Sequence, residues 1–548
     1  MDLVQGKSVD ATAFQTIVDG NFGSGNATGT IGGNSYIITV KRTGINYQMD
    51  SNGNISELAE LPIDSAPGVL EQSGNIYTIN SIEDLVAFSY NVNSGTELYE
   101  GKTVTLGRDL DFQNDSSYAD ASAKYKKDDN GYAPDTTSTT TIKSFMTNTE
   151  GEGFVVIGNQ GFSGNKFAGN FDGKDKSLSN LYINSTSKAA FFGLIDKSIE
   201  IKNLSLVSCN IKGKEQAAGL VGFAAGNLKI NNISVSGNIE STSTSDYAGG
   251  IIGFATFDLE INNCSNSSNV TSNSITGGII SMNSSNNIVI NNCWNSGVII
   301  SSSSGSAGGI AGQCKGKITN CYNTREVNSS AAAGGIIGVD NGGSIINCYN
   351  KGIIESTVSG GIFGNCGSNL EIVNCFNNGE IQGNGIAGGI QGSGSNTVIS
   401  NCYNFKGITS NNKAGGISGE AKSITKCFNS GKVEVKGDSN PVGGITGGIN
   451  GGSITYCHNT GSVIGGSING EIHPYLQVDN TNDYLKKDVN ATTYKNAVEK
   501  TQAEMDEIMS VQNFVNLMNS YVTGNNADST KTELKTWKVE NELPVFAE

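Results

Sequence analysis

The chain has 548 residues, a formal net charge of −16 at pH 7 and 73 glycines, and hydrophobic residues make up 36% of it. With glycine counted as apolar, this composition is normal for a protein that buries a core. Residues 181–470 contain 15 acidic and 16 basic residues, so the negative charge lies in the two flanks. Because the sequence holds no basic face or stripe, we expect no nucleic-acid partner.

Targeting and zinc-binding signals are absent from the sequence. No signal peptide, transmembrane segment or lipidation motif is visible, and we expect an export signal to have been removed. The chain has 2 histidines, His458 and His473, and no Cys-x-x-Cys pair, so zinc binding is disfavoured. We expect no cofactor.

Residues 1–60 predict a small separate α+β segment. The runs 36–40 and 45–49 are strand-like, residues 52–53 (Asn-Gly) favour a tight turn, and residues 11–18 fit a short helix. This stretch resembles the small sheet that ends pilin-like proteins of type IV pilus systems in Gram-positive bacteria, although their long apolar N-terminal helix is missing. A generic hairpin explains the same pattern.

Residues 61–180 predict a linker, a cap helix and the first coils of the repeat region. Ser81 and Asp84 resemble a capping box, which predicts a helix from residue 82 to about 91. The apolar pattern of residues 103–112 predicts the first coil.

The stretch 113–150 is rich in Ser, Thr, Asp and Lys. A segment of this length and polarity predicts a long surface insertion. Apolar runs between residues 154 and 173 resume the rhythm of the coils.

Two motifs recur with a period near 27 residues from about residue 190 to 465. One is Gly-Gly-Ile, whose second glycine is Gly250, Gly278, Gly309, Gly335, Gly361, Gly389, Gly416 and Gly444. The other is, with small changes, Asn-Cys-aromatic-Asn, whose cysteines are Cys264, Cys293, Cys321, Cys348, Cys375, Cys402, Cys427 and Cys457. Such a fixed period is the sequence signature of a stacked-repeat protein.

Each repeat contains three short strand-like runs separated by Gly and Asn, which form turns. The predicted fold class is therefore all-β, a right-handed parallel β-helix over residues 181–470 with coils of about 27 residues. Short helical caps and the small N-terminal α+β segment flank it. The C-terminal cap is expected at 471–548, where Thr501 and Glu504 form a capping box ahead of an apolar helical stripe.

The recurring cysteines and asparagines predict two internal ladders. Copies stacked about 4.8 Å apart have parallel Cβ vectors, which makes disulfides hard to form, so we interpret the cysteines as buried free thiols. The asparagine two positions after each cysteine predicts amide hydrogen bonds from coil to coil. A bend at Asn320 would let Ile318 and Cys321 both face inward. The ladder asparagines are Asn266, Asn295, Asn323, Asn350, Asn377, Asn404, Asn429 and Asn459.

An aromatic residue follows six of these cysteines and should point away from the thiols, in an outward stack. These residues are Trp294, Tyr322, Tyr349, Phe376, Tyr403 and Phe428. Such a strip predicts a binding surface for a sugar or a protein partner. A ladder that only stabilises the sheet explains the same pattern.

The repeats resemble the GLUG motif, named for Gly-Leu-hydrophobic-Gly, which residues 219–222 spell directly. Residues 347–350, Asn-Cys-Tyr-Asn, match its usual continuation, and the resemblance covers about residues 150–470. It implies a bacterial surface or secreted protein, because GLUG repeats occur in such proteins, including the non-catalytic parts of some IgA-cleaving metalloproteases. The family supplies no catalytic residues.

We therefore expect an extracellular or cell-surface adhesin or structural stalk. The pilin-like segment extends this expectation to a minor type IV pilus subunit that displays the β-helix. The expected partners are a host or environmental glycan, a surface protein and other pilus subunits. The alternative is a secreted β-helix lyase or hydrolase that acts on polysaccharides.

An enzyme of that kind needs paired carboxylates or a basic residue gathered on one face. Glu200, Glu260 and Glu371 share one repeat position, and Glu355 and Glu434 share another, but none of these residues lie on adjacent coils. We therefore expect no catalytic residues in the array.

Other chemical signatures are weak. Arg325 is the only arginine of the array, and neither His-Glu-x-x-His nor a P-loop occurs. Asp109 with Asp111, and the acidic run 128–130, could bind calcium. A strand end and a solvated loop explain these residues as well, and we expect no metal.

Overall fold

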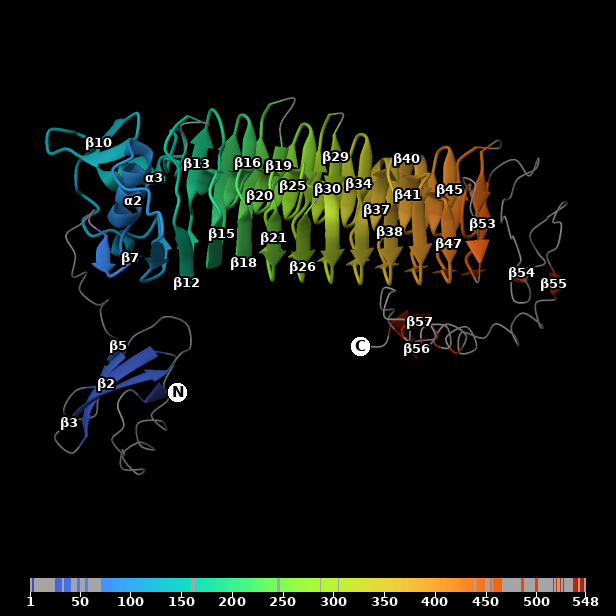
Figure 1. Ribbon diagram of the computed structural model, residues 1–548, viewed down its shortest axis with the longest axis horizontal. Helices are drawn as coiled ribbons and strands as arrows, with labels where there is room; N and C mark the ends of the chain where they lie inside the picture. The colour runs from blue at the N-terminus through green and yellow to red at the C-terminus, as the bar shows by residue number, and fades with distance from the viewer. Residues whose placement is uncertain are drawn as a thin grey trace.

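The computed structural model describes residues 70–465 and, outside this range, a few short stretches near both ends of the chain. Short gaps in that range lie at residues 159–162, 244–246, 286, 304, 438–439, 449–453 and 456. The described region is a parallel β-helix of about 13 turns, stacked along the long axis of the molecule (Figure 1). The predicted fold class is confirmed.

The number of strands in a coil varies from the predicted three, as in the coil of β34 (Ile337–Ile346), β35 (Tyr349–Asn350) and β36 (Ile354–Gly360), to five. In one coil the five strands are β24 (Ile275–Gly277), β25 (Ile280–Asn283), β26 (Ile288–Asn291), β27 (Trp294–Asn295) and β28 (Ile299–Ser301). Two of the predicted strands are each divided by a corner, one after the Gly-Gly pair and one at the asparagine before the cysteine. Each strand pairs in parallel with its counterpart in the next coil.

The corner before each cysteine is made by a residue in the left-handed backbone region. Asparagine adopts this region more readily than other residues with a Cβ, because its short polar side chain bonds locally. Lys426 takes the same position with φ of 53°. The bend expected at Asn320 is confirmed, and it turns both Ile318 and Cys321 into the core, where neither is exposed. The asparagine corners, with φ between 52° and 56°, are Asn263, Asn292, Asn320, Asn347, Asn374 and Asn401.

Three rows of strands carry the candidate binding surfaces. Sheet A consists of β12 (Asn170–Ser179), β15 (Ile199–Gly213), β18 (Leu228–Ser241), β21 (Leu259–Asn262), β26, β30 (Ala311–Thr319), β34 (Ile337–Ile346), β38 (Leu370–Val373), β42 (Thr397–Ser400), β47 (Ser423–Thr425) and β51 (Ile454–Thr455). The ladder row consists of β22 (Ser265–Asn266), β27, β31 (Tyr322–Asn323), β35 (Tyr349–Asn350), β39 (Phe376–Asn377), β43 (Tyr403–Asn404), β48 (Phe428–Asn429) and β52 (His458–Asn459). The third row consists of β23 (Asn269–Ser272), β28, β32 (Val327–Ser329), β36 (Ile354–Gly360), β40 (Ile381–Gly388), β44 (Ile408–Ser410), β49 (Val433–Val435) and β53 (Val463–Ile464).

Two further rows complete the coils on either side of the Gly-Gly corner. The row before the corner contains β16 (Gln216–Ala218), β19 (Tyr247–Gly249), β24, β29 (Ser306–Gly308), β33 (Ala332–Gly334), β45 (Lys413–Gly415) and β50 (Val442–Gly443). The row after it contains β14 (Phe192–Ile195), β17 (Val221–Ala224), β20 (Ile252–Ala255), β25, β37 (Phe363–Cys366), β41 (Gln391–Gly394) and β46 (Ser418–Glu420). The strand β13 (Tyr182–Ser185) pairs with β15.

The core runs down the inside of the coils. In the coil of β24–β28, Ile279, Ile280, Ile290, Cys293 and Ile299 have no exposed surface. Each fully buried isoleucine contributes about 1.5–3 kcal/mol. A single coil cannot enclose these side chains, so the core forms only when neighbouring coils stack.

Helix α2 (Ile82–Ser94) lies at the N-terminal end of the solenoid (Figure 1). The Ser81 hydroxyl accepts a hydrogen bond from the Asp84 N–H at 3.1 Å, as the capping pattern predicts. The Asp84 carboxylate accepts from the N–H of Asn80 at 3.0 Å, and the helix ends at Gly95 with φ of 76°. Below it lie β6 (Glu71–Ser73), β7 (Ile76–Ile79), β8 (Thr103–Leu106) and β9 (Leu110–Asp111), of which β8 pairs with both β7 and β12.

The polar stretch 113–150 is folded against this cap. It contains η1 (Asp115–Ser117), β10 (Tyr125–Asp128), β11 (Gly131–Pro134) and α3 (Ile142–Thr147). Five of its larger apolar residues are buried, namely Tyr118, Tyr125, Tyr132, Ile142 and Met146. The polar residues of the stretch therefore form its outer surface, and its tyrosines pack against the cap.

Short sheets are described near the two ends of the chain. The N-terminal sheet contains β1 (Asp2–Leu3), β2 (Gly25–Ile31), β3 (Asn34–Val40), β4 (Tyr47–Met49) and β5 (Ile55–Glu57), in the order β1-β3-β2-β4-β5. Near the C-terminus, β54 (Tyr484–Lys486) pairs with β55 (Val498–Lys500), and β56 (Trp537–Glu540) pairs with β57 (Leu543–Phe546). The helix expected at 11–18 and the capping box at Thr501 lie outside the described residues.

Candidate binding surfaces

The asparagines after the cysteines form a continuous chain of amide hydrogen bonds. The side-chain N–H of each donates to the Oδ1 of the next, from Asn266 through to Asn459, at 2.7–2.8 Å. The same Nδ2 atoms also donate to the carbonyl two residues later in their own coil, at 2.6–3.0 Å. Burying an amide costs little when all its groups are paired in this way. These residues are structural and offer no free group to a ligand.

The Gly-Gly motif recurs because the asparagine ladder lies against it. A Cβ on Gly335 would lie 2.1 Å from the carbonyl oxygen of Gly361 and 2.5 Å from the Asn350 side chain. Gly361 has the same relation to Asn377, with a 2.4 Å approach. Only glycine leaves room there, so the two sequence motifs are two halves of one packing arrangement.

A second asparagine ladder was missed by the sequence reasoning. It runs through the left-handed corner residues, whose amides bond between coils, with one break where Asn320 donates to Asn291. Asn292 donates to Asn263 at 2.7 Å, and Asn401 donates to Asn374 at 2.8 Å. The signal was present in the sequence, because asparagine precedes nearly every ladder cysteine.

The structure places the cysteines inside the coils as free thiols. Of the eight predicted ladder cysteines, Cys457 is partly exposed and the other seven have no exposed surface. The Cys321 thiol donates to the carbonyl of Thr319 at 3.1 Å, and its sulfur accepts from the N–H of Cys293 at 3.4 Å. Burial raises the pKa of Cys264, Cys321, Cys375 and Cys402. A buried thiol with a raised pKa is a poor nucleophile and a poor metal ligand.

The aromatic residues form the expected stack, with its rings face to face. Tyr322 and Tyr349 have ring centroids 4.8 Å apart and an interplanar angle of 2°, and Tyr349 and Phe376 are 4.8 Å apart at 7°. Trp294 begins the stack, 5.9 Å from Tyr322. Because each inner ring has both faces against its neighbours, only ring edges are left for a ligand. A sugar that stacks on a ring face has no place within this row.

The strip is also shorter on the surface than the sequence predicts. Tyr403 and Phe428 are each only 2% exposed, so they do not belong to an exposed strip. Phe405 lies against Tyr403, with ring centroids 4.5 Å apart, and helps to cover it. Trp294, Tyr322, Tyr349 and Phe376 remain partly exposed. This geometry favours a stabilising ladder.

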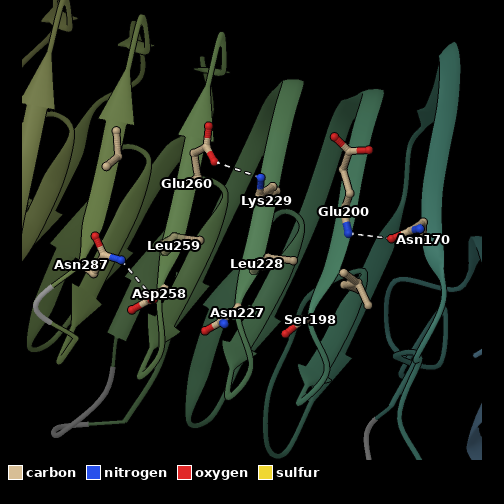
Figure 2. A pocket seen from close by; sticks show the side chains of 12 residues that line it. Asn170, Ser198, Glu200, Asn227, Leu228, Lys229, Asp258, Leu259, Glu260 and Asn287 are labelled. Carbon is tan, nitrogen blue, oxygen red and sulfur yellow. Dashed lines mark hydrogen bonds and ion pairs between the residues drawn. The ribbon is translucent and has the colours of Figure 1, made fainter. Parts of the chain in front are cut away.

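A shallow groove of about 620 Å³ lies on the outer face of sheet A, near the N-terminal end of the array (Figure 2). Strand pairing aligns Glu200, Lys229, Glu260 and Val289 in one row across four coils. A second row, at the turns that lead into these strands, contains Ser198, Asn227, Asp258 and Asn287. All of these side chains project from the outer face of the strands and turns, because the alternate strand positions hold the core.

The charges of the groove are arranged in pairs. The Lys229 ammonium lies 3.6 Å from the Glu260 carboxylate, and Lys202 lies 2.8 Å from Glu200. The Asn287 amide donates to Asp258 at 3.0 Å. The groove therefore presents mixed donors and acceptors that neighbouring side chains hold in place.

The carboxylates that share a repeat position are separated by other residues, as the sequence predicts. Lys229 lies between Glu200 and Glu260 in the row, which puts the two glutamates about 10 Å apart along the stack. Glu371 lies farther along the same row, and residues at two intervening coils separate Glu355 from Glu434. Glycoside hydrolysis needs two carboxyl groups that face one scissile bond. Here Lys229 lies between the two glutamates of the row.

The acidic residues considered for calcium already hold backbone and side-chain donors. Asp109 accepts from the N–H of Ser177 at 2.7 Å, and Asp111 accepts from Asn180 at 2.7 Å. Asp128 accepts from the N–H of Asn130 at 2.7 Å and from the Tyr90 hydroxyl at 3.0 Å. Among the described residues, no three His, Cys, Asp or Glu side chains gather as a metal site. No helix in the described part of the chain is long and apolar enough to cross a membrane.

Comparisons with known proteins give two distant likenesses. No family model matches the chain. Halomucin of Haloquadratum walsbyi is 26% identical over 222 residues, which is 39% of this chain and 2% of Halomucin. A solved structure described as a candidate immunoglobulin A1 protease from Bacteroides ovatus is 16% identical, and the match covers 88% of this chain and 100% of that one with a TM-score of 0.29. At these levels neither protein's activity transfers to this chain.

Proposed function

We propose that this protein is a non-catalytic binding rod displayed outside a bacterial cell, where it acts as an adhesin or stalk. The observation that carries the proposal is the unbroken, fully paired amide ladder from Asn266 to Asn459. A stack of about 13 coils at about 4.8 Å each is on the order of 60 Å long. Such a rod holds rows of outward side chains at a constant spacing.

The resemblance to GLUG repeats supports surface display, and it extends the proposal to the partners. These are a host or environmental glycan or a surface protein. A pilin-like role of residues 1–60 adds a second proposal, in which the protein is a minor pilus subunit bound to other subunits. That segment contains a described sheet of five short strands.

Bead retention tests the binding function. Beads coated with the native chain are passed over glycan-coated and epithelial surfaces, and beads coated with heat-denatured chain serve as the control. We expect several-fold greater retention of the native beads. Equal retention of both kinds of bead on every surface would contradict the proposal.

A polysaccharide-cleaving enzyme is the second candidate, and one observation favours it. Glu200, Lys229 and Glu260 lie in one row on one face. Their two carboxyl groups and one amine could contact a polysaccharide bound along that row. Release of reducing ends or of unsaturated products from polysaccharides would establish this candidate. This release of products would have to disappear in the Glu260→Gln variant.

A further inference from the structure

The groove on sheet A offers side chains and not backbone to a ligand. The N–H and C=O groups of β15, β18, β21 and β26 are paired between coils along the solenoid. A peptide therefore cannot add to this face as an extra strand, which is the usual way in which a sheet binds an extended peptide. Recognition here depends on carboxylates, amides and an ammonium group.

We propose that this groove is a subsite for an uncharged oligosaccharide that lies along the solenoid axis. The inference deepens the proposed binding function and rests on it. A neutral sugar chain presents hydroxyl groups that both donate and accept hydrogen bonds. The rows containing Lys229, Glu260, Asn227 and Asp258 supply both kinds of partner at the coil spacing.

The charge of the groove selects against acidic ligands. Three carboxylates, from Glu200, Asp258 and Glu260, line it, and two ammonium groups face them, that of Lys229 in the groove and that of Lys202 beside Glu200. A uronic acid or a sialic acid would add a fourth negative charge near these groups. A like charge at close range disfavours binding, so a neutral sugar fits better.

Two exposed apolar side chains belong to the turns and strands that carry the polar rows. Phe257 directly precedes Asp258 in the chain and is 53% exposed. Among the described residues its ring takes part in no ring pair, unlike the rings of the aromatic ladder. Val289 ends the charged row and is 36% exposed. A pyranose has an apolar C–H face and hydroxyl edges, which this combination matches.

Asn227 adds a polar group that is free to bind. Its side chain is exposed and makes no hydrogen bond among the described residues, whereas the amides of Asn170 and Asn287 are engaged with Glu200 and Asp258. A ligand hydroxyl can therefore reach Asn227 without displacing a protein partner. Figure 2 shows it on the turn between those of Ser198 and Asp258.

Isothermal titration calorimetry of the full chain tests the subsite. The probes are the neutral hexasaccharides of β-1,4-glucan, α-mannan and β-galactan, with oligogalacturonate of similar length as the acidic probe. The variants are Asn227→Ala, Phe257→Ala and Glu260→Gln. Glu371→Gln is the matched control, because Glu371 is exposed at the same repeat position of sheet A outside the groove.

We expect a neutral probe to bind and each groove variant to raise its Kd about tenfold, the effect of one lost hydrogen bond to a charged group or one lost ring contact. The control should change the Kd less than about twofold, and circular dichroism should show that all variants stay folded. Stronger binding of oligogalacturonate than of any neutral probe would overturn the ligand class.

The remaining outcomes separate this inference from the proposed function. Binding of a neutral probe that the groove variants leave unchanged would overturn the subsite while the binding rod stands. Absence of binding by every probe, with native beads still retained on epithelial surfaces, would overturn the oligosaccharide subsite. The binding rod would then have a protein ligand. Absence of both would contradict the proposed function itself.

Discussion

Asn350 connects three coils through one side chain. Its amide donates to Asn377 at 2.8 Å and to the carbonyl of Gly352 at 2.8 Å, and its oxygen accepts from Asn323 at 2.8 Å and from the N–H of Gly352 at 3.1 Å. Every polar atom of the amide is therefore paired in a buried site. A side chain in this position stabilises the stack only if its neighbours carry the same group, which explains why the motif repeats as a unit.

Replacing Asn350 by alanine should weaken the stack at that coil. The amide groups of Asn323 and Asn377 would each lose a partner inside the protein, at a cost of about 2–4 kcal/mol in the free energy of unfolding. Denaturant unfolding and amide hydrogen exchange in the adjacent coils measure the effect. Asn378→Ala is the control, because its half-buried side chain makes no hydrogen bond among the described residues, and it should change stability by less than about 0.5 kcal/mol.

The glycine opposite this asparagine should be equally sensitive. The alanine Cβ of a Gly335→Ala variant would meet the Gly361 carbonyl at 2.1 Å, so the two coils must move apart. We expect a loss of about 1–3 kcal/mol, the usual effect of overpacking. Gly367→Ala, where a Cβ meets nothing within 4 Å, is the comparison. Equal stability of the two variants in thermal unfolding would show that the close approach is not required.

At the scale of elements, the N-terminus of α2 joins the cap to the insertion. The buried Glu83 carboxylate in its first turn accepts hydrogen bonds from the N–H groups of Ala119 and Asp120 at 2.8 and 2.9 Å. A carboxylate there also interacts favourably with the positive end of the helix. These two hydrogen bonds attach the stretch 113–150 to the cap, together with the packing of its buried tyrosines.

A Glu83→Gln substitution should loosen this stretch while leaving the β-helix intact. Glutamine keeps one acceptor oxygen, so one N–H loses its partner at a cost of about 1–3 kcal/mol. Limited proteolysis should then cut within residues 113–150 several times faster than in the parent chain. The exposed Glu150→Gln serves as the control and should leave the cutting rate unchanged. A parental rate in Glu83→Gln would mean that the tyrosine contacts alone hold the stretch.

The sequence predicts the elements that depend on period and composition, and it misses those that depend on close contacts. The repeat period predicts the β-helix, and the offset of Ile318 from Cys321 predicts the bend at Asn320. The division of some coils into five strands depends on the left-handed corner residues. The need for glycine at Gly335 arises from a backbone approach between coils. The burial of Tyr403 and Phe428, and the fold of 113–150, depend on which surfaces meet, which a single sequence does not encode locally.

The residues of the groove are also only partly predictable from the sequence. The sequence shows that Glu200 and Glu260 share a repeat position, but it does not indicate Lys229 between them or Asp258 at the neighbouring turn. The register of the coils brings these residues together, and the sequence pattern does not give that register exactly. The exposed Phe257 lies in a turn that varies between coils, so no periodic signal marks it.

At the scale of the whole molecule, the buried thiols make stability depend on pH. Burial raises the pKa of Cys209 to about 12, and it raises the pKa of Cys264, Cys321, Cys375 and Cys402 as well. The folded protein therefore keeps these five thiols protonated at pH values where the unfolded chain ionises them, above about pH 8.5. The unfolded state then binds fewer protons, so the stability present below that pH is lost as the pH rises toward 12.

Thermal unfolding between pH 7 and pH 11 measures this dependence. We expect the Tm to fall progressively above about pH 8.5, and the fall to be shallower in the Cys209→Ala variant than in the parent chain. The comparison uses the slope and not the Tm itself, because the alanine variant also leaves a small cavity. A constant Tm over this range would show that the thiols ionise equally in both states, and a rising Tm would show that they ionise more readily in the folded state.

The proposed role requires the rod to bind a neutral glycan without cleaving it. The most direct test incubates the full chain with the neutral hexasaccharides and measures bound ligand and new reducing ends in the same sample. The account predicts saturable binding that Glu260→Gln weakens, with reducing ends no higher than in the sugar alone. New reducing ends that appear with the parent chain and vanish with Glu260→Gln would contradict it and identify an enzyme.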